Sequence, residues 1–403
     1  MLDLADVEEA RERISDLVVH TPLKPSRALS AETRTDVHLK LETFQRTGAF
    51  KIRGAANRIL ALSDEDRSAG VVTASAGNHA QGVALAATES GVDATVVMPE
   101  TAAISKVEAT RGYGATVRLA GEGYEDAQHI AHEIAAEEGR TYVHAFDDPA
   151  VMAGQGTIAL ELLEDLSDVD TVVVPIGGGG LISGIATGLA GRRSSIRVIG
   201  VQAEGAASVP ESLERGEIVE RGSVDTIADG IATRRVGDLA FDIIRNHVDE
   251  VVTVSDDEIA MALTRMIERD KIVVEPAGAV GVAALLGDQL VFENDEVVAP
   301  VISGGNIDLN VLTTIIVRGL VETGRYVKIR TVLKDRPGAL ERLAACIASR
   351  EANIFAIRHD RTSRDVALNA AEVELELELR GEDHLREVVE GLERDGYEVE
   401  IVG

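Results

Sequence analysis

A lysine in an apolar, glycine-flanked segment is the strongest chemical feature of the sequence. Lys51 lies within the segment TGAFKIRGA, and the whole chain contains only seven lysines. Removal from water disfavours the charged form of an amine, so burial would turn Lys51 into a nucleophile that can form a Schiff base with an aldehyde. The alternative is that Lys51 begins a helix and extends its charge into water. The surrounding motifs must decide between these interpretations.

A glycine-rich turn follows an apolar strand further along the chain. Residues 174–184 read VPIGGGGLISG. Backbone N–H groups of such a turn, together with the positive end of the helix that follows, suit a phosphate group. A dinucleotide loop would need a third glycine where the chain has Ile182 or Ser183, although Glu204 stands where a ribose partner could lie. A monophosphate is therefore favoured, and a purely structural turn is the remaining alternative.

Polar side chains gather at a second turn between a strand and a helix. Residues 73–82 read TASAGNHAQG. The Ser75 hydroxyl and free backbone N–H groups suit a carboxylate, while Asn78 can donate a hydrogen bond to a phenolate-like oxygen. The alternative is that Ser75 or Asn78 caps the helix without any ligand.

A serine follows the last strong apolar strand. Residues 303–306 read SGGN and come directly after the strand expected at 297–302. The carboxyl end of a parallel strand is where such sheets bind ligands, so Ser303 is a candidate ligand contact. A plain turn is the alternative.

The elements around these motifs alternate between strands and helices. Apolar strands separated by amphipathic helices predict parallel sheets covered on both faces, and two separated glycine-rich turns predict two lobes with a cleft, the smaller lobe at about 41–149. Strands are expected at 37–41, 70–75, 94–99, 115–119, 141–146, 171–175, 197–202, 251–254 and 297–302, and helices at 4–17, 78–90, 101–111, 124–138, 149–166, 181–189, 256–268, 275–286 and 308–322.

The pattern changes after residue 322. Val373, Leu375, Leu377 and Leu379 alternate with glutamates, which indicates an antiparallel strand with one buried face. The expected order is βαββαβ, a ferredoxin-like domain at 326–403. Its strands are expected at 326–333, 353–359, 373–379 and 397–402, and its helices at 338–349 and 384–393.

Composition excludes several classes of protein. The formal net charge is −29, which disfavours binding to nucleic acids and to anionic membranes. Scarce lysine and evenly spread acidic residues suggest a halophilic source. Cys346 is the only cysteine, so neither an intrachain disulfide nor a cysteine zinc site is expected. The N-terminus lacks a signal-peptide pattern and no apolar run could span a bilayer, so we expect a cytoplasmic protein.

Taken in order, these motifs resemble the fold-type II pyridoxal phosphate enzymes, in particular the threonine/serine dehydratases (threonine ammonia-lyases), over residues 1–322. The resemblance implies that Lys51 binds the cofactor as a Schiff base, with Phe50 beside the ring. It implies that Asn78 contacts the 3′ oxygen of the ring and Ser303 its pyridine nitrogen. The implied phosphate contacts are Gly177, Gly178, Gly179, Gly180 and Leu181, and the implied substrate carboxylate site is Ser75, Ala76, Gly77 and His79.

The resemblance also implies a reaction. Lys51 would take the α-proton of the amino acid, and loss of the β-hydroxyl would lead to a 2-oxo acid and ammonia. L-Threonine would give 2-oxobutanoate and L-serine would give pyruvate. Relatives that racemise serine have a second serine where this chain has Ala76, which favours elimination. A serine racemase or serine-preferring dehydratase is the first alternative, and a catalytically inactive amino-acid sensor is the second.

Those relatives also bind a divalent cation after the strand that ends at Glu204. Residues 205–210 supply no further carboxylate, so no divalent metal site is expected, and a monovalent ion held by carbonyl groups stays open.

The C-terminal domain resembles an ACT domain, a small module that binds amino acids at paired interfaces. The matching pieces are DRPGAL at 335–340 and ANI at 352–354. The resemblance implies a homodimer or homotetramer, and an amino-acid effector such as isoleucine or valine if the enzyme is biosynthetic. Contacts with the effector would come from Asp335, Gly338, Asn353 and Ile354. The alternative is an oligomerisation module without a ligand.

Overall fold

The computed structural model describes residues 2–362 and 367–402. The chain forms two compact units, residues 1–307 and 308–403. The boundary predicted from the sequence lies after helix α14 (Leu309–Glu322), whereas the two units divide before it. This helix therefore groups with the C-terminal unit.

The larger sheet of the first unit has six strands in the order β1-β2-β10-β7-β8-β9. All neighbouring strands are parallel except β1, which is antiparallel to β2. The strands are β1 (Leu23–Pro25), β2 (Asp36–Leu41), β7 (Thr171–Pro175), β8 (Arg197–Ala203), β9 (Glu250–Val254) and β10 (Val297–Ile302).

The smaller sheet has four parallel strands in the order β5-β4-β3-β6. They are β3 (Val71–Ala74), β4 (Ala94–Met98), β5 (Thr116–Leu119) and β6 (Thr141–Tyr142). The strand predicted over 141–146 is thus only two residues long. The chain turns away because His144 Nδ1 accepts hydrogen bonds from the backbone N–H groups of Phe146 and Asp147.

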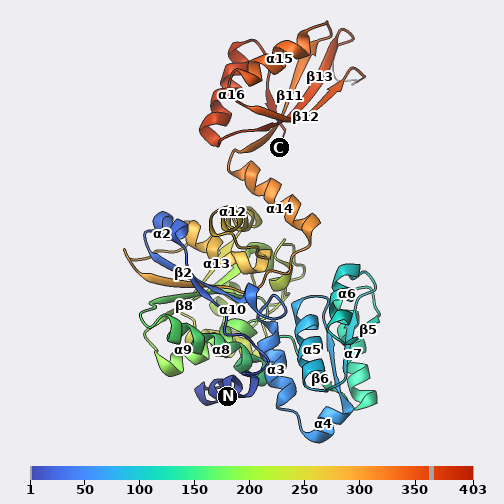
Figure 1. Cartoon of the computed structure of the whole chain (residues 1–403), viewed down its shortest axis with the longest axis vertical. Helices are drawn as coiled ribbons and strands as arrows, with labels where there is room; N and C mark the ends of the chain where they lie inside the picture. The colour runs from blue at the N-terminus through green and yellow to red at the C-terminus, as the bar shows by residue number, and fades with distance from the viewer. Residues whose placement is uncertain (1, 363–366, 403) are drawn as a thin grey trace. The chain divides into compact units, whose positions relative to one another are not determined.

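Helices cover both sheets, as the apolar strands predict (Figure 1). The hydrophobic stretches of α8, α9 and α13 are buried almost throughout. The helices are α1 (Leu4–Ile14), α2 (Arg27–Thr33), α3 (Lys51–Leu60), α4 (Asp64–Ala69), α5 (Asn78–Glu89), α6 (Ile104–Gly112), α7 (Tyr124–Glu138), α8 (Pro149–Asp165), α9 (Gly180–Arg192), α10 (Val209–Arg215), α11 (Asp238–His247), α12 (Asp256–Arg265) and α13 (Pro276–Leu286).

The C-terminal unit confirms the predicted βαββαβ order. Its antiparallel sheet runs β12-β13-β11-β14, and the alternating apolar residues of β13 are buried. The last strand is shorter than the predicted 397–402. The elements are β11 (Tyr326–Lys334), α15 (Ala339–Ala348), β12 (Asn353–Asp360), β13 (Ala370–Glu378), α16 (Glu382–Arg394) and β14 (Glu400–Ile401).

A buried ionic cluster anchors the helix that begins with Lys51. The guanidinium of Arg53 is fully buried and binds both oxygens of Glu42, at 2.8 and 2.9 Å. Its Nη1 also lies 2.6 Å from Glu161 on α8. Glu161 in turn accepts a 2.6 Å hydrogen bond from Lys40 on β2. The cluster joins α3 to the large sheet and to α8, because two carboxylates balance two buried cations.

Replacement of Arg53 by methionine should be strongly destabilising. The change leaves the Glu42 carboxylate buried without a cation, and we expect the free energy of unfolding to fall by about 3–5 kcal/mol. Urea unfolding followed by circular dichroism measures this loss. Arg11→Met is the matched control, because Arg11 pairs with Glu164 at the exposed surface and should cost at most about 1 kcal/mol. Equal losses for the two variants would contradict the anchoring role.

Candidate active site

The loop before Lys51 is hydrogen-bonded to the SGGN loop. The Gly305 N–H donates to the Gly48 carbonyl at 2.9 Å, and the Phe50 N–H donates to the Ser303 carbonyl at 3.1 Å. Ser303 is buried directly after β10. Lys51 is the first residue of α3 and therefore lies beside the carboxyl end of a central strand. That edge of a parallel sheet is where such folds bind ligands.

The amine of Lys51 lies in surroundings that disfavour its charge. Nζ donates a 2.9 Å hydrogen bond to the Ala145 carbonyl and lies 5.1 Å from the centre of the Phe50 ring. Burial lowers the pKa of Lys51 to about 8, and the nearby Glu275 carboxylate opposes this shift only in part. The interpretation of Lys51 as a cation extended into water is therefore not supported, whereas the nucleophilic interpretation is.

The four glycines at 177–180 form a turn that excludes other residues. A Cβ atom added to Gly178 would lie 2.4 Å from the Phe146 ring, and one added to Gly180 would lie 2.6 Å from the Phe146 carbonyl oxygen. Gly179 has φ +92° and precedes the thirteen-residue helix α9. Bare backbone at a helix N-terminus fits the phosphate of a bound cofactor.

The turn at residues 75–79 (SAGNH) has a partly exposed beginning and a buried end. Ser75, Ala76 and Gly77 are partly exposed, and the Ser75 hydroxyl accepts a 3.1 Å hydrogen bond from the Gly77 N–H. The His79 ring is buried, with Nε2 donating to the Val143 carbonyl at 3.0 Å. Burial lowers the pKa of His79 to about 3, so this ring is neutral.

Two further polar residues meet Asn78, and neither was assigned a role from the sequence. The Asn78 amide donates to both carboxylate oxygens of Glu275, at 2.8 and 3.0 Å. The Asn306 amide donates to the Asn78 carbonyl oxygen at 2.8 Å. Glu275 precedes Pro276, and a proline at this position reads in sequence as the ordinary start of a helix, here α13. Only the fold brings it to Asn78, because the two lie 197 residues apart.

The residues implied as effector contacts lie at two ends of the C-terminal sheet. Gly338 has φ +80° and is the N-cap of α15, and Asp335 lies in the turn between β11 and this helix. Asn353 begins β12 and is paired with Glu378 of β13, which in turn is paired with Tyr326 at the start of β11. Asn353 therefore lies at the end of the sheet opposite to Asp335 and Gly338. Ile354 packs against the core of this unit. One copy of the chain therefore does not bring the two pairs together.

Neither a metal-binding cluster nor a membrane-spanning helix is present in the described part of the chain. Within residues 2–362 and 367–402, no group of three His, Cys, Asp or Glu side chains is placed to hold a metal ion. No helix in these ranges is long and apolar enough to cross a membrane. Glu204 is exposed at the end of β8.

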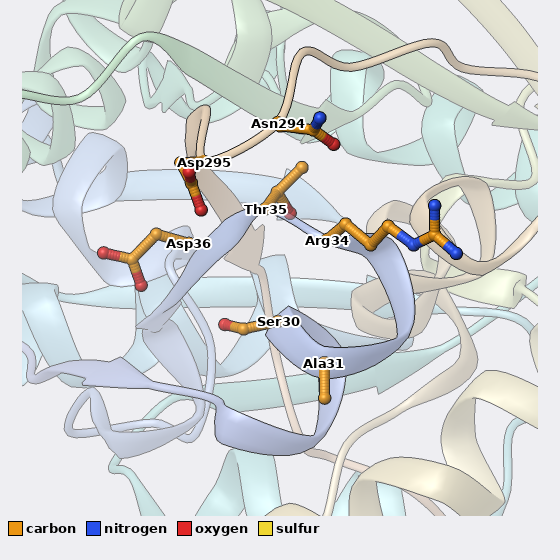
Figure 2. A pocket seen from close by; sticks show the side chains of 7 residues that line it. All are labelled: Ser30, Ala31, Arg34, Thr35, Asp36, Asn294 and Asp295. Atoms are coloured by element: carbon orange, nitrogen blue, oxygen red, sulfur yellow. The ribbon is translucent and has the colours of Figure 1, made fainter.

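A shallow polar pocket lies at the opposite end of the larger sheet (Figure 2). It adjoins the start of β2, whereas Ser303 follows the end of the parallel strand β10. The amino ends of parallel strands are not the usual ligand edge, so we do not place the reaction there. Its lining residues are Ser30, Ala31, Arg34, Thr35, Asp36, Asn294 and Asp295.

The family model described as pyridoxal-phosphate dependent enzyme matches residues 14–304. The chain belongs to this family. An L-threonine ammonia-lyase of Thermotoga maritima is 48% identical over 403 residues, which are 100% of both chains. The glycine turn and the partly desolvated Lys51 amine fit the phosphate and the aldehyde of this cofactor.

Two solved structures share the fold of the first unit. Maize serine racemase is 39% identical, with a TM-score of 0.75 over 80% of this chain and 98% of that chain. Processed threonine deaminase isoform 2 from Solanum lycopersicum is 38% identical, with a TM-score of 0.75 over 78% of this chain and 91% of that chain. The predicted two-lobed fold-type II architecture is confirmed.

The lowered pKa of Lys51 predicts how cofactor attachment depends on pH. An amine with a pKa of about 8 becomes neutral above that pH, whereas an ordinary lysine stays charged up to 10.5. The rate at which the apoprotein binds pyridoxal phosphate should therefore rise with pH and level off above about pH 8. Stopped-flow absorbance measures this rate. A midpoint near the ordinary lysine value would contradict the burial argument, and Lys271→Ala is the control.

Proposed function

We propose that the chain deaminates L-threonine to 2-oxobutanoate and ammonia, and that it acts on L-serine as well. One observation carries the proposal. Lys51, whose amine has a lowered pKa, begins α3 beside Ser303. Its Nζ is bonded to the carbonyl of Ala145, and the next residue, Phe146, packs against the glycine turn at 177–180. The full-length likeness to a protein named L-threonine ammonia-lyase supports the choice of substrate.

The chain's own residues would act on the substrate as follows. Pyridoxal phosphate, when bound, would withdraw electrons from the substrate α-carbon. Lys51 is neutral in part near neutral pH, so Nζ can accept the α-proton, with the Ala145 carbonyl orienting the amine. Gly177, Gly178, Gly179, Gly180 and Leu181 would hold the phosphate, Phe50 would flank the ring, and Asn78 and Ser303 would contact its oxygen and nitrogen.

The substrate carboxylate would bind at the start of α5. Ser75, Ala76 and Gly77 offer backbone N–H groups and one hydroxyl at a helix N-terminus, where an anion is stabilised. His79 would hold this turn in place through the hydrogen bond that its ring donates to the Val143 carbonyl. Serine racemisation is the second candidate, favoured by the likeness to maize serine racemase. Ala76 brings no second hydroxyl to the turn, which supports elimination instead.

We infer that residues 326–403 form an ACT regulatory domain in a cytoplasmic homodimer or homotetramer. The βαββαβ order supports this assignment. Because Asp335 and Gly338 lie at the other end of the sheet from Asn353, an effector that contacts all of them needs a second copy of the chain. A biosynthetic enzyme would be regulated by isoleucine or valine. The net charge of −29 supports a halophilic source.

Assay of 2-oxo acid release tests the proposed reaction. The wild-type protein should convert L-threonine and L-serine without forming D-serine. Lys51→Ala should lower kcat by at least about 100-fold, because the general base and the attachment point are both removed. Lys271→Ala, at an exposed lysine, should keep full activity. Substantial turnover by Lys51→Ala would refute the assignment, and D-serine as the main product would favour the racemase.

Added amino acids test the proposed regulation. Isoleucine or valine should change the threonine concentration at half-maximal rate, and Gly338→Val should remove that response. The side chain would be strained at the left-handed φ of Gly338 and would obstruct the backbone there. Steady-state kinetics with a panel of amino acids measures the effect. Unchanged kinetics across the panel would indicate an oligomerisation module instead.

A further inference from the structure

Glu275 is a buried carboxylate that forms no ion pair within the described residues. The residue is 4% exposed, and Lys51 and Lys106 act on its carboxylate only through their charge. It occupies the N-cap position of α13, yet its side chain makes no capping hydrogen bond. Both of its oxygens accept from Asn78 instead. An unpaired buried carboxylate is unfavourable for stability, so a functional role must be considered.

One backbone carbonyl fixes the orientation of the side-chain amides of Asn306 and Asn78. The Thr47 carbonyl can only accept, so the atom of Asn306 that lies 2.6 Å from it must be the amide nitrogen. The same nitrogen lies 2.8 Å from Asn78, whose facing atom is therefore the oxygen. The Asn78 nitrogen then faces Glu275, which as a carboxylate can only accept.

We propose that Glu275 and Asn306 are positioning residues that lock the Asn78 amide with its nitrogen side toward the cofactor ring oxygen. The proposal rests on the proposed contact between Asn78 and the cofactor. Nδ2 carries two hydrogens that point in different directions, whereas the two oxygens of the Glu275 carboxylate lie side by side, so both oxygens share one hydrogen. The other hydrogen stays available, and the negative carboxylate polarises the amide, which strengthens it as a donor to the ring oxygen.

Two glycines leave room for the side chains of Glu275 and Asn306. A Cβ atom added to Gly304 would lie 2.3 Å from Glu275 Oε1, and one added to Gly48 would lie 2.6 Å from Asn306 Oδ1. Gly48 also has φ +71°, which disfavours other residues. The glycines of TGAFK and SGGN thus leave space for the side chains of Glu275 and Asn306.

Charged groups from several elements surround the carboxylate. Lys51 of α3 and Lys106 of α6 lower the pKa of Glu275, whereas Asp229, at the start of a short 3-10 helix, raises it. Lys106 and Asp229 also pair with each other at 3.0 Å. Burial raises the pKa of Glu275 to about 7, although the Asn78 hydrogen bond opposes the rise. Near Lys51, His79 and His144 remain neutral because burial lowers their pKa values.

A pH titration of the cofactor absorbance tests the role of Glu275. Glu275→Gln keeps the shape of the side chain but removes its charge, so protonated forms of the bound cofactor lose stabilisation. The titration midpoint should move down by about one pH unit. In an Asn78→Ala background the same substitution should leave the midpoint nearly unchanged, because the effect passes through Asn78. Glu137→Gln, at an exposed glutamate, is the control.

Cofactor affinity tests the role of Asn306. Asn306→Leu removes the lock on Asn78, and the dissociation constant for pyridoxal phosphate should rise about tenfold, as expected for loss of one oriented hydrogen bond. Asn246→Leu on the exposed face of α11 is the control. Thermal unfolding of each variant separates misfolding from mispositioning.

The possible outcomes separate this inference from the proposed function. An unshifted midpoint in Glu275→Gln, or an equal shift with and without Asn78, would overturn the positioning role while the wild-type enzyme remains active. A wild-type protein that binds no pyridoxal phosphate would refute the proposed function and this role together. A shift that depends on Asn78, with weaker binding in Asn306→Leu, would support the inference.

Discussion

The ionic contacts of Arg53 hold the helix on which the chemistry depends. Two residues after Lys51, the guanidinium binds Glu42 beside β2 and Glu161 on α8. Helix α3 therefore cannot shift along the sheet without breaking buried ion pairs, a change that is strongly unfavourable. The Lys51 amine is placed by this anchor on one side and by backbone bonds to the SGGN loop on the other.

Four helices begin at the site, and their direction sets its electrostatics. Helices α3, α5, α9 and α13 start at Lys51, Asn78, Gly180 and Pro276. Helix N-termini carry partial positive charge, which stabilises anions such as a phosphate or a carboxylate and disfavours a lysine cation. The same arrangement makes the buried carboxylate of Glu275 tolerable. The direction of these helices thus favours anion binding at the site, whereas burial lowers the pKa of the Lys51 amine.

Much of this fold was predictable, because local pattern decides long apolar or amphipathic segments. The predicted limits of α7, β7 and β10 match the structure to the residue. The length of strand β6 was overestimated, because the turn after it depends on hydrogen bonds to the His144 ring, which the hydrophobic pattern does not encode. Glu275 was missed for a related reason. Its sequence context is that of an ordinary helix start before Pro276, and only tertiary structure brings it to Asn78.

Chemical trapping of the cofactor tests the central claim most directly. The purified protein is saturated with pyridoxal phosphate, reduced with borohydride, digested and mapped by mass spectrometry. The account predicts that the label is attached to Lys51, because burial favours its neutral amine. A label on another lysine, or no stable label on Lys51, would contradict the claim that this residue is the covalent anchor.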